Sequence, residues 1–196
     1  MDIKEKTRQL YELYRQFETA SQPYISSAVC KPGCADCCTT VGNVDITTLE
    51  GLIILRHLQS CPPALQKDLS KRLKLNRKEK MESKYARCAF LDAANRCAIY
   101  TVRPFSCRRL YSVKPCGETG PTVHRQVWEM AENIVSAIQV LDSNGYSGHL
   151  SYVLQLLNDA RFKKIYLNDQ FFPDEIKEFA QKHALLINRF TTTPEK

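Results

Sequence analysis

Four cysteines within nine residues constrain this chain more than any other feature of its sequence. They form the motif Cys30-Lys-Pro-Gly-Cys34-Ala-Asp-Cys37-Cys38. Burial as small hydrophobic side chains does not explain them, because a loop containing proline and glycine offers no core in which to pack. Coordination explains them, because a metal ion needs several thiolates within ~2.3 Å of it. Cys34-x2-Cys37 is the chelating step typical of zinc and iron–sulfur sites, so the loop predicts a metal site.

A second group of cysteines, Cys88, Cys97 and Cys107, follows about 50 residues later. Seven thiols in two groups predict either two metal sites or one polynuclear centre, and we expect the two groups to meet in space. Adjacent side chains diverge, so Cys37 and Cys38 should not both bind one mononuclear ion. One of them would bind a second metal or a different iron of a cluster.

Two further cysteines stand apart from these groups. Cys61 follows an amphipathic segment and precedes two prolines, so we interpret it as a structural thiol. Cys116 is either a buried structural thiol or a ligand. Cys116, or a histidine such as His124, would complete a second site with four ligands. The remaining histidines are scattered and form no recognisable catalytic group.

Several arginines accompany the second cysteine group. Thiolates on a divalent ion leave a net negative charge, which guanidinium groups can neutralise while donating hydrogen bonds to sulfur. We predict this role for Arg103 and Arg108, with Arg109 as a further candidate.

Clustered thiols also indicate the compartment. In a reducing environment such thiols bind metal or carry out redox chemistry more often than they form disulfides. The first ten residues contain no apolar signal-peptide core, and no apolar run approaches the ~20 residues of a membrane span. We therefore expect a cytoplasmic protein.

The remaining sequence predicts a mainly α-helical protein, in which amphipathic helices surround an irregular cysteine-rich core. Helical periodicity predicts a helix over 3–20, and a Thr47–Glu50 capping box predicts a short one from Leu49 to about Leu58. A composition rich in Leu, Lys, Arg and Glu predicts a basic helix over 64–84. Three apolar stripes follow from residue 122, and a break at 143–148 separates the first from the second. The length of 196 residues suits a single domain, 1–196, with a metal-binding core at 28–116 and a helical part at 122–196.

The cysteines of the second group lie in short, irregular elements. Two apolar runs flank the turn-forming stretch DAANR in residues 88–100, which predicts a small β-hairpin that brings Cys88 and Cys97 together. Pro104 should block a helix in the segment that follows and leave Cys107 on an extended loop.

These motifs are similar to those of a known family. The run Cys-x3-Cys-x2-Cys-Cys, then Cys88-Ala-Phe-Leu, then Cys97-Ala-Ile-Tyr-Thr-Val-Arg-Pro-Phe-Ser-Cys107-Arg, resembles the bacterial YkgJ-type cysteine cluster family, described as zinc- or iron-chelating. The resemblance covers roughly residues 28–110. It implies that the metal ligands are the seven cysteines of the two groups, Cys30, Cys34, Cys37, Cys38, Cys88, Cys97 and Cys107.

Three classes of function follow. The first is a protein whose zinc, iron or iron–sulfur centre has a structural or regulatory role. The second is a metal-dependent enzyme, because flagellin lysine N-methylases carry a similar cysteine pattern; yet the chain has no dinucleotide fingerprint, P-loop or H-E-x-x-H motif. The third is nucleic-acid binding through residues 64–87, which hold six of the seven net positive charges. Tyr85 is the one aromatic residue there, so aromatic residues for base stacking are not interleaved along the charged run, and an acidic protein is an alternative partner.

Overall fold

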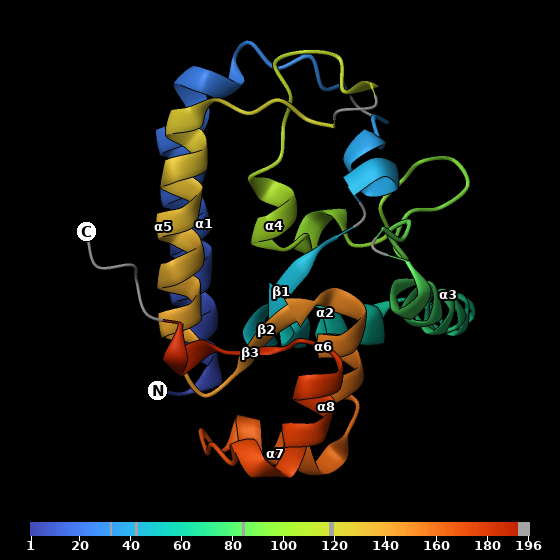
Figure 1. Cartoon of the computed structure of the whole chain (residues 1–196), viewed down its shortest axis with the longest axis vertical. Helices are drawn as coiled ribbons and strands as arrows, with labels where there is room; N and C mark the ends of the chain where they lie inside the picture. Colours follow the sequence, from blue (N-terminus) through green and yellow to red (C-terminus); the bar gives the residue numbers. More distant parts are fainter. Residues whose placement is uncertain (32, 42, 84, 118–119, 192–196) are drawn as a thin grey trace.

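Two long antiparallel helices form one side of the molecule in the computed structural model, which describes residues 1–31, 33–41, 43–83, 85–117 and 120–191. These are α1 (Ile3–Ile25) and α5 (Arg125–Leu141), and they lie side by side (Figure 1). Their apolar faces meet in a core that includes Leu10, Phe17 and Val127. The predicted helix over 3–20 is confirmed and extends five residues further.

A second core lies between α2 (Thr48–Ser60), α3 (Pro63–Glu82) and α6 (Leu150–Leu157). The predicted capping box is present: the Thr47 hydroxyl accepts from the Glu50 N–H, and the Glu50 carboxylate accepts from the Thr47 N–H. Two short helices from the C-terminal part of the sequence, α7 (Ala160–Leu167) and α8 (Lys177–Lys182), cover this core (Figure 1). The mainly helical fold class is therefore confirmed.

A small antiparallel sheet lies between the two cores, in the order β1 (Asp45–Thr47), β2 (Tyr146–His149), β3 (Leu186–Ile187). Ile46 pairs with Gly148, and Ser147 pairs with Leu186. The sequence did not predict these strands, because two to four residues are too few to show alternation. β2 occupies the second half of the break expected at 143–148.

The segment around Pro104 corrects another prediction. Pro104 does not leave an extended loop; it is the N-cap residue of a one-turn helix, α4 (Phe105–Arg108), which follows a 3₁₀ turn at Tyr100–Val102. Proline is tolerated at a helix start, because the N–H groups of the first turn have no partner within the helix.

No helix within the described ranges is both long and apolar enough to cross a membrane.

Candidate metal centre

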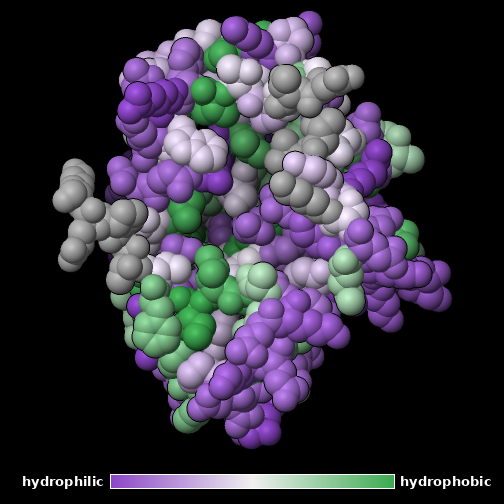
Figure 2. Space-filling model, in the orientation of Figure 1, coloured by the Kyte–Doolittle hydropathy of each residue, from purple (hydrophilic) through white to green (hydrophobic). Residues whose placement is uncertain are grey.

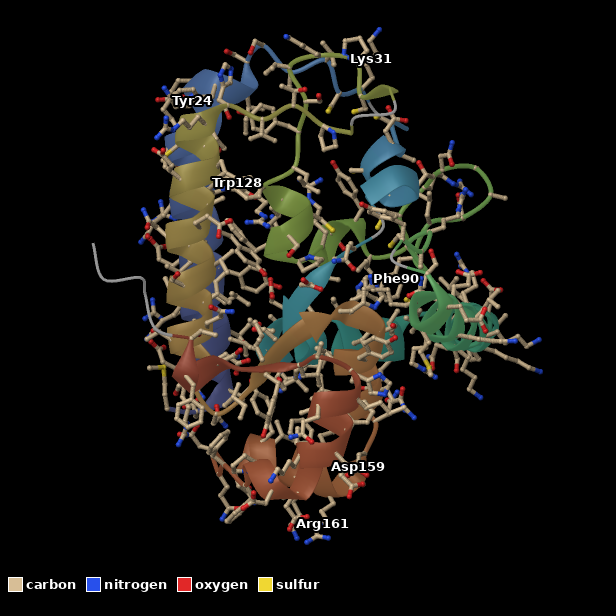
Figure 3. All side chains as sticks on the ribbon, in the orientation of Figure 1. Tyr24, Lys31, Phe90, Trp128, Asp159 and Arg161 are labelled. Carbon is tan, nitrogen blue, oxygen red and sulfur yellow. The ribbon has the colours of Figure 1, made fainter. Side chains whose placement is uncertain are left out.

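The first cysteine loop is joined directly to the second cysteine segment. Cys37 opens a π-helical turn, Cys37–Val41. The carbonyl of Cys38 accepts a hydrogen bond of 2.9 Å from the backbone N–H of Cys88. In Figure 3, sulfur atoms lie between the labelled Lys31 and Phe90, on the side of the molecule away from Asp159 and Arg161. Cys37 and Cys38 of the first group therefore meet the second group, as the sequence predicted.

Cys88 and Cys97 lie on the two sides of a tight turn. The turn is closed by backbone hydrogen bonds of 2.9 Å from Asp92 to Arg96 and from Ala98 to Phe90. Leu91 and Cys97 form an isolated antiparallel bridge, and no strand is assigned in the described part of 88–100. The predicted hairpin is thus reduced to its turn and one bridge, which still brings the two cysteines to one place.

Cys107 reaches the same place from α4. The N-terminus of this helix is fixed by Glu50 of α2, whose carboxylate accepts a 2.8 Å hydrogen bond from the backbone N–H of Phe105. Phe105 is buried and stacks on Tyr14 of α1. A one-turn helix is not stable alone, so these contacts with α1 and α2 position Cys107.

Five thiols are near enough for their charges to interact, and we call them the five-thiol cluster: Cys37, Cys38, Cys88, Cys97 and Cys107. A hydrogen bond from the Cys38 thiol lowers the pKa of Cys37 to about 7, and the same bond raises the pKa of Cys38, with burial and the charges of Cys37, Cys88 and Cys107 adding to it. Burial raises the pKa of Cys88 to about 11. Burial also raises the pKa of Cys97 and Cys107, against the nearby positive charge of Arg103.

A second set of thiols lies beside this cluster, and we call it the Cys116 group: Cys30, Cys34 and Cys116. The backbone N–H of Ser112 donates to Cys30 Sγ at 3.3 Å. Buried Cys116 is hydrogen-bonded to the side chains of Ser112 and Asp36, and burial raises its pKa, with the charge of Cys34 adding to the effect. Asp36 also raises the pKa of Cys37, so it lies between the two sets.

Asp36 and Ser112 contact these thiols although neither was predicted to belong to the site. Asp36 lies within the cysteine motif, which is a weak signal for proximity. Nothing in the sequence indicated that Ser112 contacts two thiols.

The sequence left open whether Cys116 or His124 completes a second site with four ligands. His124 lies against the rings of Tyr24 and Tyr111, whereas Cys116 lies with the other thiols of its group. Cys61 lies at the C-terminus of α2, where its thiol donates to the His57 carbonyl at 3.4 Å.

The chemistry of these donors fits a thiophilic metal. Thiolates are soft ligands that select zinc, copper(I) or iron–sulfur clusters. Buried neighbouring thiols resist deprotonation because each thiolate would repel the next, whereas a bound cation compensates that charge. Within the described ranges, however, no three His, Cys, Asp or Glu side chains are arranged to hold one ion. The thiols are neighbours, and coordination requires their side chains to turn toward a common point.

The predicted arginines divide into two kinds. Arg103 is near Cys97 and Cys107, and its charge lowers the pKa of both thiols, as expected for a neutralising residue. Arg108 instead binds Glu18 at 2.7 Å, and Arg109 binds Glu132 at 2.6 Å. The prediction for these two is wrong, because α4 directs them to the carboxylates of α1 and α5.

Comparison with known proteins adds one finding to this geometry. Residues 29–128 match the family model CxxCxxCC, described as "Putative zinc- or iron-chelating domain". The chain belongs to this family. The matched region spans every cysteine from Cys30 to Cys116, and so includes both the five-thiol cluster and the Cys116 group. No curated protein and no solved structure matches the chain.

Proposed function

We propose that this CxxCxxCC-family chain binds zinc or iron, the latter also as an iron–sulfur cluster, through the seven predicted cysteines, with Cys116 as an eighth thiol. The observation that carries the proposal is the five-thiol cluster. Its members come from three separate segments and meet in one partly buried place, where the charge of Arg103 acts on Cys97 and Cys107. A chelating role is consistent with the description of the family.

The role that this arrangement supports is structural or regulatory. A metal held by these thiols would tie the first cysteine loop, the 88–100 turn and α4 to one another. Backbone hydrogen bonds between these segments are few in the described residues, and the one from Cys88 to Cys38 is the clearest. Metal binding would then supply folding free energy to this region, and its loss would loosen it. A closed tetrathiolate zinc site leaves no open position for a substrate.

Metal analysis of anaerobically purified protein, with an absorption spectrum, tests the proposal. Broad visible absorption with bound iron would identify an iron–sulfur cluster, and colourless protein containing zinc would identify a zinc site. Protein that binds neither metal after reconstitution would contradict the proposal.

The same measurement on Cys107→Ser locates the metal, with Cys61→Ser as the matched control outside both thiol sets. A fall from two metals to one indicates separate sites, and the loss of all metal indicates a shared centre. Unchanged metal content would remove Cys107 from the ligand set. Cys116→Ser tests the eighth thiol in the same way.

A further inference from the structure

A cavity of about 460 Å³ lies between the sheet, α4 and α5, on the face that Figure 2 shows to be hollowed. Its walls include Asp45 of β1, Ser106 and Arg109 at α4, Glu132 of α5, and Lys80 of α3. None of the described residues that line it is a cysteine, so it is separate from both thiol sets. Its volume is within the range of small-molecule sites, about 300–1,000 Å³.

Asp45 places a carboxylate on the cavity wall. Its side chain is exposed to the cavity, yet the surrounding walls desolvate it and raise its pKa. Its backbone carbonyl accepts from the Ser106 hydroxyl at 2.5 Å, but its carboxylate makes no hydrogen bond or ion pair with any residue that the structure describes. A partly desolvated carboxylate is stabilised by a cationic hydrogen-bond donor, so Asp45 favours an ammonium group on a ligand.

Two cations face the same space. The charges of Lys80 and Arg109 both act on Asp45, so the three groups share one electrostatic neighbourhood. Arg109 is held in place by Glu132 at 2.6 Å and by Trp128, whose ring lies 5.0 Å from the guanidinium carbon. The bond to Glu132 uses one of the five N–H donors of a guanidinium, which leaves donors for an anionic ligand group.

Part of the remaining wall is aromatic and apolar, beside polar groups such as Glu50 and Gln139. Tyr152 stacks on His183 with ring centroids 4.1 Å apart, and His149 meets Tyr152 edge-on at 5.6 Å. Ile46 and Ile138 contribute apolar surface. These groups would accommodate a substituent that carries no charge of its own.

We propose that this cavity binds a small zwitterion of the α-amino acid class. The ammonium group would bind Asp45, the carboxylate would bind Arg109 and Lys80, and the side chain would lie along the aromatic and apolar wall. A simple cation would meet the charges of Lys80 and Arg109, and a simple anion would meet that of Asp45. A molecule carrying both charges matches both parts of the site. The proposal is independent of the metal centre.

Calorimetric titration of the full-length protein with each of the twenty free L-amino acids tests the proposal. We expect at least one to bind with a Kd below about 1 mM, which corresponds to more than about 4 kcal/mol of binding free energy. The best ligand is then compared with its N-acetyl form, which lacks the cation, and with its carboxamide, which lacks the anion. Each should bind at least about tenfold more weakly.

Two variants locate the binding. Asp45→Asn and Lys80→Gln should each weaken binding at least about tenfold, whereas the matched exposed substitutions Asp68→Asn and Lys78→Gln should not. Failure of all twenty amino acids to bind would overturn the proposal. Equal binding of a capped form would also overturn it, because the cavity would then recognise only one charge; this comparison uses the unmodified protein and does not depend on how the variants fold.

Discussion

Asp142 is a fully buried carboxylate that connects distant parts of the chain. It accepts hydrogen bonds from the Tyr166 hydroxyl at 2.6 Å, from the Leu49 N–H at 3.0 Å, and from the Asn188 amide at 3.1 Å. Burial raises its pKa to about 7, against these hydrogen bonds and the charge of Lys6. The α2 N-terminus, α7 and the C-terminal turn therefore all depend on one titratable group.

This pKa predicts how stability changes with pH. An unfolded aspartate titrates near pH 3.9, so between about pH 4 and pH 7 the folded state keeps a proton that the unfolded state has released. Asp142 therefore reduces stability as pH rises through this range. The stability advantage of wild type over Asp142→Asn should shrink by roughly 2 kcal/mol between pH 5 and pH 7.

Chemical denaturation of both proteins at each pH, with equal metal content verified, provides the measurement. Asp68→Asn, an exposed substitution, should show a constant difference from wild type. A constant difference for Asp142→Asn would show that this carboxylate is not protonated in the folded protein near neutral pH.

Glu50 is the residue through which α1, α2 and α4 depend on one another. Its carboxylate accepts from the Tyr14 hydroxyl at 2.6 Å, from the Phe105 N–H at 2.8 Å, and from the Thr47 N–H at 2.8 Å, all buried. Glu50→Ala leaves these donors without a partner, at a cost of about 1–3 kcal/mol each. We expect a loss of about 3 kcal/mol or more in urea unfolding, whereas Glu82→Ala on exposed α3 should change stability by less than about 0.5 kcal/mol. A loss below 1 kcal/mol for Glu50→Ala would contradict the inference that α1, α2 and α4 depend on one another through this carboxylate.

At the scale of elements, the long helices could be predicted and the short elements could not. Thr47 and Glu50 predicted the start of α2, apolar periodicity predicted α1 and α5, and composition predicted α3. The strands are fixed by tertiary contact instead: a Cβ on Gly148 would lie 2.5 Å from a methyl group of Leu185, which shows how closely another segment packs against β2. Likewise, α4 exists because Glu50 and Tyr14 bind Phe105, which no local pattern reveals.

The candidate site follows the same division. Spacing predicted a metal site in the first cysteine group, and the family resemblance implied the set of seven ligands, because clustered thiols are typical of metal binding. The direction of a side chain near them could not be predicted, since it depends on partners far along the chain. Glu18 attracts Arg108 from 90 residues away, and Glu132 attracts Arg109.

The basic helix α3 carries its charge on the side opposite its buried face. Leu69, Leu73 and Asn76 are buried, whereas an exposed stripe at helical spacing consists of Lys67, Lys71, Lys74 and Lys78. None of these four lysines forms an ion pair with another described residue. Replacing all four by glutamine should therefore leave the free energy of unfolding within about 2 kcal/mol of wild type, since exposed substitutions each contribute less than about 0.5 kcal/mol. A larger loss in urea unfolding would mean that the stripe packs against the protein.

At the scale of the whole molecule, order in the cysteine region and order in the helices have different sources. The α1–α5 pair buries a continuous apolar core that includes Leu10, Phe17 and Val127, and this core needs no cofactor. The first cysteine loop buries little: Cys30, Cys34 and Asp36 are exposed, and Ala35 is the buried apolar residue between them. If thiolates hold this loop through a metal, then its stability is the part of the molecule that metal binding supplies.

Hydrogen exchange measured before and after chelation should therefore separate the two regions. Removal of the metal should speed amide exchange by at least about tenfold in peptides covering residues 28–41 and 88–100, because local opening there loses its metal cross-link. Peptides from α1 and α5 should keep their protection, which makes them the internal control. The Cys37→Ser variant should reproduce the pattern without a chelator, whereas Cys61→Ser should not. Uniform loss of protection across the chain would show that the metal holds the whole fold together. Unchanged exchange at 28–41 would show instead that protein contacts alone order the cysteine loop, and the thiols would then have to be explained without a structural metal.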